Sequence, residues 1–185
     1  MKHFKIFLKF SFFAIIGFAL FSSCSQKYSE EISRVDSLQL SLDVIDAKLY
    51  ELDSNQVYVL YNKYTDTWAR LSKVFPDVRD ENWGTLCAFE NIKSGIKGFK
   101  KHYSKLTKEL EKSKIQLNSL KEDLKNENIE IEKFEEFYNS EVQAIFQLGL
   151  VTNLTIDNAK EGIVRFDSLS PIMEKVILQY QELQN

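Results

Sequence analysis

Hydrophobic residues recur at alternating steps of three and four along almost all of residues 27–183, and only two prolines interrupt that span. A spacing near 3.5 residues, sustained over many turns, places these side chains on one face of an α-helix and is typical of coiled-coil-like packing. The chain is therefore predicted to be all-α, with long helices packed side by side. The most regular series comprises Phe89, Ile92, Ile96, Phe99, Tyr103, Leu106, Leu110, Leu117, Leu120 and Leu124, with Ser113 in register.

Three helices are expected from the positions at which this pattern breaks. Pro76 lacks an amide hydrogen and restricts Phe75, so a first helix over about 27–75 should end there. The polar cluster at 125–128 separates a second helix, about 83–125, from a third, about 129–183. Pro171 is expected to kink the third helix or to split off a short final one. The turns at 53–56 lack a hydrophobic residue and indicate a local irregularity in the first helix.

The charges alternate between these segments. The net charge is −2 over residues 27–75, +5 over 83–125 and −7 over 127–185. A basic helix between two acidic ones reduces self-repulsion, although an exposed ion pair is worth only ~0–1 kcal/mol. No repeat with the period of a solenoid is visible. We therefore expect an antiparallel three-helix bundle that is similar in outline to a spectrin-type repeat, a likeness of fold that carries no function.

Such a bundle fixes which residues of neighbouring helices lie at the same level, including the glycines and the largest aromatic residues. It places Tyr64 at the level of Gly95, and Gly95 opposite Lys160. Glycine inside a helix costs roughly 0.5–1 kcal/mol relative to alanine, so these glycines need a reason. We interpret them as space for the rings of Tyr64 and Trp68. The alternative is that they let the second helix bend around a partner. The glycines concerned are Gly95, Gly98 and Gly162.

The beginning of the chain has the three-part layout of an export signal. A positive segment precedes an apolar run over residues 10–21, and Ser22 and Ser23 then precede Cys24. The run of about 12 residues is shorter than the roughly 20 that cross a bilayer. We expect residues 1–23 to be a removed signal peptide and residues 24–185 to form one helical domain; an uncleaved membrane anchor is the alternative. The positive residues are Lys2, Lys5 and Lys9.

The sequence LFSSC at residues 20–24 resembles the lipobox of bacterial lipoproteins, with Phe21 where that family usually has Leu. The resemblance implies a diacylglycerol on the Cys24 sulfur, cleavage before Cys24, and usually a further acyl chain, such as palmitate, on the new amino group. Ser25 rather than Asp follows Cys24, which in many Gram-negative lipoproteins implies the outer membrane rather than the inner one. We therefore expect a protein held to a membrane of the cell envelope through lipid on Cys24.

Composition excludes some functions. The chain has 24 basic and 27 acidic residues, and the signal holds three of the basic ones, which leaves 21 against 27, or −6. A mildly acidic chain is a poor general nucleic-acid binder, so no nucleic-acid partner is expected. With Cys24 lipidated, Cys87 is the one remaining thiol, and no intramolecular disulfide is possible. Stability must then come from packing.

No catalytic constellation is visible. An activated nucleophile needs a nearby base and a group that orients the base, and His102 is the one histidine after Cys24. The Glu-x-x-His pairs of di-iron bundles do not occur. We therefore expect a non-enzymatic protein without a metal or a cofactor.

Two surfaces are candidates for binding a partner. The first is the tip turn with Phe75, Arg79 and Trp83, because loops often carry function and these residue types are enriched in binding hot spots; alternatively, Trp83 covers the bundle end against Phe75. The second is a basic stripe that either binds an anionic partner, such as a lipid head group or a polyanionic glycan, or is a solvated face balanced by Glu on the other helices. This lysine stripe comprises Lys93, Lys97, Lys101, Lys105, Lys108 and Lys112.

The motif Asp-Ser-Leu occurs twice, at residues 36–38 and 167–169. It resembles the Asp-Ser/Thr-apolar O-glycosylation site of exported Bacteroidota proteins, which implies glycans on Ser37 and Ser168. Together these features predict a lipid-anchored spacer or protein-interaction module with an envelope protein as its partner. The alternative is a helical bundle that binds an apolar or anionic envelope ligand.

Overall fold

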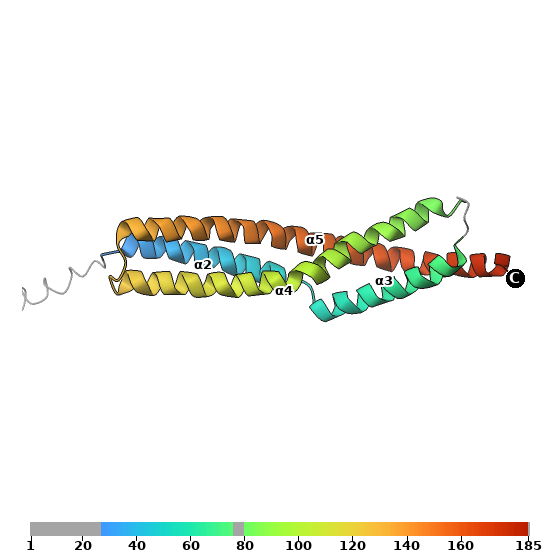
Figure 1. The fold of residues 1–185 in the computed structure, drawn as a ribbon, viewed down its shortest axis with the longest axis horizontal. Helices are drawn as coiled ribbons and strands as arrows, with labels where there is room; N and C mark the ends of the chain where they lie inside the picture. Colours follow the sequence, from blue (N-terminus) through green and yellow to red (C-terminus); the bar gives the residue numbers. More distant parts are fainter. Residues whose placement is uncertain (1–26, 76–79, 185) are drawn as a thin grey trace, which may run out of the picture.

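The computed structural model describes residues 27–75 and 80–184, and the predicted signal and Cys24 lie outside them. The described residues form the helices α2 (Ser29–Leu49), α3 (Ser54–Val74), α4 (Trp83–Lys125) and α5 (Ile131–Gln184) (Figure 1). These ranges contain no strand, so the all-α prediction is confirmed.

The expected first helix is two helices, α2 and α3. α2 ends at Leu49, and the amide of Tyr50 donates to the carbonyl of Asp46 at 3.1 Å. Asp53 then begins α3, because its carboxylate accepts a hydrogen bond from the amide of Asn55 at 2.8 Å. Aspartate is favoured at this position since it satisfies an amide that has no partner within the helix. The prediction of one helix over 27–75 was wrong, and the break lies just before the turns that lack a hydrophobic residue.

The other helix ends follow local rules. Phe75 has φ −62° and ψ 127°, the extended conformation expected before a proline, so α3 ends where the sequence predicted. α4 ends in a Schellman motif, in which the amide of Asn128 donates to the carbonyl of Asp123 at 2.8 Å. Glu127 takes the left-handed position of this motif, with φ 53°.

α5 continues through Pro171 without a break. Proline removes the hydrogen bond to the carbonyl four residues earlier, which belongs to Asp167. Both Pro171 and Asp167 are exposed, so water can reach this carbonyl. A separate final helix after Pro171 is therefore wrong, and α5 is 54 residues long.

α4 and α5 extend along the whole rod, and α2 and α3 pack against them one after the other (Figure 1). Residue numbers rise together in the ion pairs between α2 and α5, so these helices run in the same direction. They run oppositely in the pairs between α2 and α4, so α4 runs back along α2. The pairs are Arg34–Glu135 and Lys48–Asp157 for α2 and α5, and Asp36–Lys121 and Asp46–Lys114 for α2 and α4.

The glycines do not have the role that the sequence suggested. Tyr64 stacks on Phe89 with ring centroids 5.1 Å apart, and its hydroxyl donates to the carbonyl of Glu90 at 3.4 Å. Tyr64 thus lies more than a turn of α4 away from Gly95. A β-carbon at Gly95 would meet the backbone of α5 at Asn158, one turn or less from the expected Lys160. The expected closeness of α4 and α5 at Gly95 is present, but the space is not for Tyr64.

Candidate partner-binding surfaces

Aromatic rings pack together at the end of the rod where α3 ends and α4 begins. Phe75 lies with its ring centroid 5.9 Å from that of Trp83 and 6.5 Å from that of Tyr180. The Tyr180 hydroxyl donates to the carboxylate of Asp80 at 2.7 Å. This bond holds the pKa of Asp80 below its ordinary value, and burial raises the pKa of Tyr180. Trp83 therefore packs against Phe75 at the end of the bundle, as one of the two interpretations expected.

A groove of about 290 Å³ opens beside these rings, between α3 and α4. Its walls are mainly apolar, with one carboxylate and one hydroxyl, so it suits an apolar side chain of a partner. Phe75 and Trp83 both line this tip groove, while Arg79 lies outside the described residues. The lining residues are Trp68, Leu71, Ser72, Phe75, Trp83, Leu86, Cys87 and Glu90.

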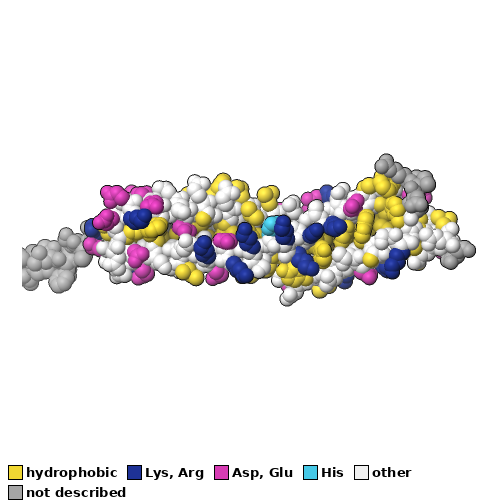
Figure 2. All heavy atoms as spheres, viewed as in Figure 1, with side chains coloured by type: hydrophobic (Ala, Val, Ile, Leu, Met, Phe, Trp, Pro, Cys, Tyr) yellow, Lys and Arg dark blue, Asp and Glu magenta, His cyan; other side chains and the backbone are white. Residues whose placement is uncertain are grey.

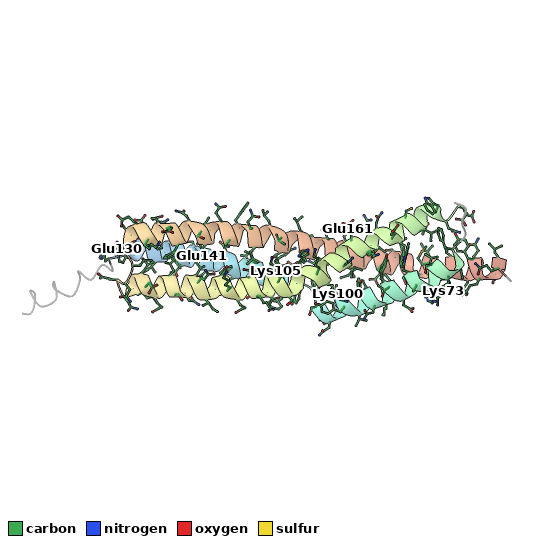
Figure 3. The ribbon with its side chains drawn as sticks, viewed as in Figure 1. Lys73, Lys100, Lys105, Glu130, Glu141 and Glu161 are labelled. Atoms are coloured by element: carbon green, nitrogen blue, oxygen red, sulfur yellow. The ribbon has the colours of Figure 1, made fainter. Side chains whose placement is uncertain are left out.

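The lysine stripe lies on the solvent side of α4, and all six side chains are exposed. Figure 2 shows basic side chains in a row along the rod, and Figure 3 places Lys105 on α4 near the middle. Within the described part of the chain, none of the six forms an ion pair. The cations in the seams between helices behave differently, since Lys48 and Lys114 each pair with an aspartate. The positive charge of the stripe is thus left to solvent or to a ligand.

A groove of about 440 Å³ follows the stripe where α4 meets α5. His102 and Lys105 on α4 face a wall of α5 that carries no charge. The structure therefore brings two basic side chains together above a mixed polar and apolar floor. The remaining lining residues are Leu106, Glu109, Ser113, Ala144, Gln147, Leu148 and Val151.

Glu141 is a buried carboxylate that the sequence reasoning missed. Glu141 is only 8% exposed, and its Oε2 has no hydrogen-bond partner among the residues that the structure describes (Figure 3). Burial raises its pKa, and the charge of Lys112 lowers it by less. Val142, the hydrophobic residue beside it, is only half-buried. A signal was present, because 134, 138, 141, 145, 148 and 152 alternate by four and three in the heptad rhythm.

Ser37 and Ser168 are both exposed on the middle of helices. The hydroxyl of Ser37 donates to the carbonyl of Ser33 at 3.0 Å, and that of Ser168 to the carbonyl of Val164 at 2.9 Å. Both hydroxyls can thus be reached from solvent, and each already makes one hydrogen bond within its own helix.

Comparison with known proteins adds no relative: no family model, no curated protein and no solved structure matches the chain. Across residues 27–75 and 80–184, no helix is both long enough and apolar enough to span a membrane. The same residues contain no group of three or more His, Cys, Asp and Glu that could hold a metal ion.

Proposed function

We propose that this chain is a lipid-anchored lipoprotein of the cell envelope, held in the outer membrane through Cys24, and that its rod is a non-enzymatic spacer and interaction module. The rod in this proposal is an antiparallel three-helix bundle with coiled-coil-like packing and the outline of a spectrin-type repeat. The proposed partner is another envelope protein, which docks at the tip groove.

The observation that most supports this proposal is that the start of α2 and the tip groove lie at opposite ends of the rod. α2 begins five residues after Cys24, at the end of the rod where α4 passes into α5 (Figure 1). The tip groove lies toward the other end, near the last turns of α3 and the first turns of α4. At 1.5 Å per residue, the 54 residues of α5 give the rod a length of roughly 80 Å. A lipid on Cys24 would therefore hold the tip groove far from the membrane surface.

The construction of the rod is suited to a spacer. α4 and α5 pass the break between α2 and α3 without interruption, so the rod has no point at which all its helices end. Ion pairs continue across the break, where Lys48 binds Asp157 at 2.7 Å and Lys160 binds Glu51 at 2.5 Å. Each such exposed pair is worth only ~0–1 kcal/mol, so the unbroken α4 and α5, more than the pairs, hold the rod together at this point.

Membrane fractionation of the full chain tests the anchor. We expect wild-type protein in the membrane fraction and Cys24→Ala protein in the soluble fraction or retained with its signal. Cys87→Ala is the matched control, because it removes the other thiol and leaves the anchor intact. Cys24→Ala protein that has lost its signal but associates with the membrane as strongly as the Cys87→Ala variant would refute the proposed anchor.

A second candidate function is binding of an anionic ligand along the lysine stripe. The observation that favours it is that six exposed lysines on one side of α4 lack an ion pair within the described residues. Opposite charges attract over about 10 Å at moderate salt, so a linear polyanion along α4 would meet several lysines at once.

Retention on immobilised polygalacturonate, a carboxylated glycan, tests this candidate. The variant Lys97→Glu/Lys101→Glu/Lys105→Glu should elute at lower salt than wild type. The matched control reverses three exposed lysines elsewhere, Lys63, Lys73 and Lys175, and so has the same net charge. If both triple variants elute together, the binding depends on net charge alone and the stripe is not a site.

A further inference from the structure

α5 contains a long uncharged stretch. No Asp, Glu, Lys, Arg or His occurs in the 15 residues from 142 to 156, although 28% of the chain is charged. A stretch of this length at the usual charged share of soluble domains would hold about four charged residues. The stretch is not enclosed by the bundle, because four of its large apolar side chains are exposed: Phe146, Leu150, Val151 and Leu154.

The uncharged surface continues onto α2, which runs beside this part of α5. Leu40 and Val44 are both exposed there. The uncharged exposed residues around them are Ser33, Ser37, Ser41 and Ala47, and the exposed carboxylate of Asp43 borders them. The acids of this part of α2 lie toward α4, where Asp36 and Asp46 pair with lysines. By helical spacing Asp36 and Asp43 adjoin Leu40, so they form the edge of the uncharged surface. We call the surface formed by Leu40, Val44, Phe146, Leu150 and Leu154 the α2–α5 face.

Ion pairs between α2 and α5 occur at both ends of this face but not within it. Arg34 binds both carboxylate oxygens of Glu135, at 2.5 and 2.9 Å, and Lys48 binds Asp157 beyond the other end. Between these pairs the two helices meet through apolar contact, since a β-carbon at Gly149 would lie 3.4 Å from Ile45. Figure 2 shows hydrophobic side chains gathered along the edge formed by α5. A charge-free apolar centre with charges at its margins is typical of a protein interface.

We propose that the α2–α5 face is the contact surface of a homodimer in which two rods lie side by side in the same direction. The mature chain is acidic, so two copies repel each other wherever their charged surfaces meet. Two copies of this face can meet through its uncharged centre while the exposed carboxylate of Asp43 stays at the margin, in solvent. A two-fold contact uses the same patch on both subunits. A partner recognised by its charge would find no complementary group here. The parallel direction rests on the proposed function, because rods anchored through Cys24 in one membrane point the same way.

The area of the face suits a modest dimer. Its five large side chains are between 44% and 70% exposed. Together they offer on the order of 500 Å² of apolar surface per copy. A standard interface buries about 800 Å² per partner, so the neighbouring amide side chains must contribute the rest. Anchoring both copies in one membrane raises their effective concentration and favours the dimer further. The neighbouring exposed amides on α5 are Gln143, Gln147 and Asn153.

Sedimentation of the purified full chain in detergent tests the surface. Wild type should pass from monomer to dimer as its concentration rises. Leu150→Asp should raise the dimer dissociation constant by about tenfold or more, because it buries a charge at the centre. The matched control is Ile115→Asp on α4, since Ile115 is also exposed, at 65%, but lies outside the face. Circular dichroism should show equal helicity in all three proteins.

A wild type that stays monomeric at every concentration would overturn the proposal. An Ile115→Asp variant that weakens the dimer as much as Leu150→Asp would also overturn it, because the contact would then lie elsewhere.

Disulfide crosslinking in cells tests the direction. With Cys87→Ser as background, single cysteines at positions 143 and 153 should each crosslink to their own copy in a parallel dimer. An antiparallel dimer would crosslink only when the two variants are mixed, and that result would overturn the parallel arrangement. Absence of every crosslink would overturn the face itself. The control is the Cys87→Ser protein without an added cysteine. A disulfide in this control would mean that Cys24 is a free thiol. That result would contradict the lipid anchor but not the dimer measured by sedimentation.

Discussion

The backbone of α4 at Gly95 approaches that of α5 so closely that a β-carbon on residue 95 would lie 2.3 Å from the carbonyl oxygen of Asn158. Because the obstacle is backbone rather than a flexible side chain, either helix must move to accommodate alanine. We predict that Gly95→Ala destabilises the protein by about 1–3 kcal/mol through overpacking, measured by urea unfolding.

Gly98 is the matched control for this prediction. A β-carbon there would meet no atom within 4 Å, and Gly98 also lies inside α4. Gly98→Ala should therefore stabilise the protein by about 0.5–1 kcal/mol, the ordinary gain of alanine over glycine in a helix. Stabilisation by both substitutions would instead support the alternative, that the glycines let α4 bend.

The buried carboxylate of Glu141 lowers the free energy of unfolding at neutral pH. Its carboxylate is buried, and one oxygen lacks a hydrogen-bond partner within residues 27–75 and 80–184, so the ionised form is disfavoured in the folded state. Glu141→Met keeps a long unbranched side chain and removes the buried charge. We expect it to raise the free energy of unfolding at pH 7 by about 1–2 kcal/mol. A loss of stability in Glu141→Met at pH 7 would show that the carboxylate has a partner.

The pH dependence of this gain follows from the direction of the pKa shift. Burial raises the pKa of Glu141 in the folded protein above its unfolded value. Protonated Glu141 therefore favours folding below the unfolded pKa, and this contribution is lost as the pH rises through the folded pKa. The stability gap between Glu141→Met and wild type should narrow between pH 7 and pH 4. A gap that stays constant over this range would mean that Glu141 does not change its protonation on folding.

The end of α4 has a residue that is poorly suited to its conformation. Glu127 has φ 53°, in the left-handed region that glycine adopts without strain. Its ion pair with Lys27 is long, at 3.5 Å, and exposed, so losing it costs little. Glu127→Gly should raise the free energy of unfolding by about 0.5–1 kcal/mol. Glu122→Gly, inside α4, serves as the control and should lower it by a similar amount.

Helix positions could be predicted from the sequence where a local rule decides them. α4 begins at Trp83 and ends at Lys125, as expected, because the heptad rhythm runs up to the polar cluster. Phe75 ends α3 because Pro76 follows it. Asp53 begins α3, but several polar residues lie together at this point, and hydrophobic spacing does not decide which of them caps a helix.

The sequence alone did not determine which residues of neighbouring helices pack against each other. Which residues of α4 lie beside Tyr64 depends on the position of α3 along α4. The break at 50–53 sets that position, and it was not predicted as a helix end. The burial of Glu141 does not follow from hydrophobicity, which favours the neighbouring Val142, whereas the heptad rhythm selects residue 141. The α2–α5 face depends on which sides of two helices stay open, which the sequence reveals only once their neighbours are known.

The central claim is that lipid on Cys24 anchors this rod, and metabolic labelling of cells with a clickable fatty acid tests it most directly. The full chain should incorporate the label, and the Cys87→Ala variant should do so equally. The Cys24→Ala variant should carry none, because the sulfur that would bear the diacylglycerol and the new amino terminus are both lost. Label that persists on the Cys24→Ala variant, or a wild-type chain that never incorporates it, would contradict the account.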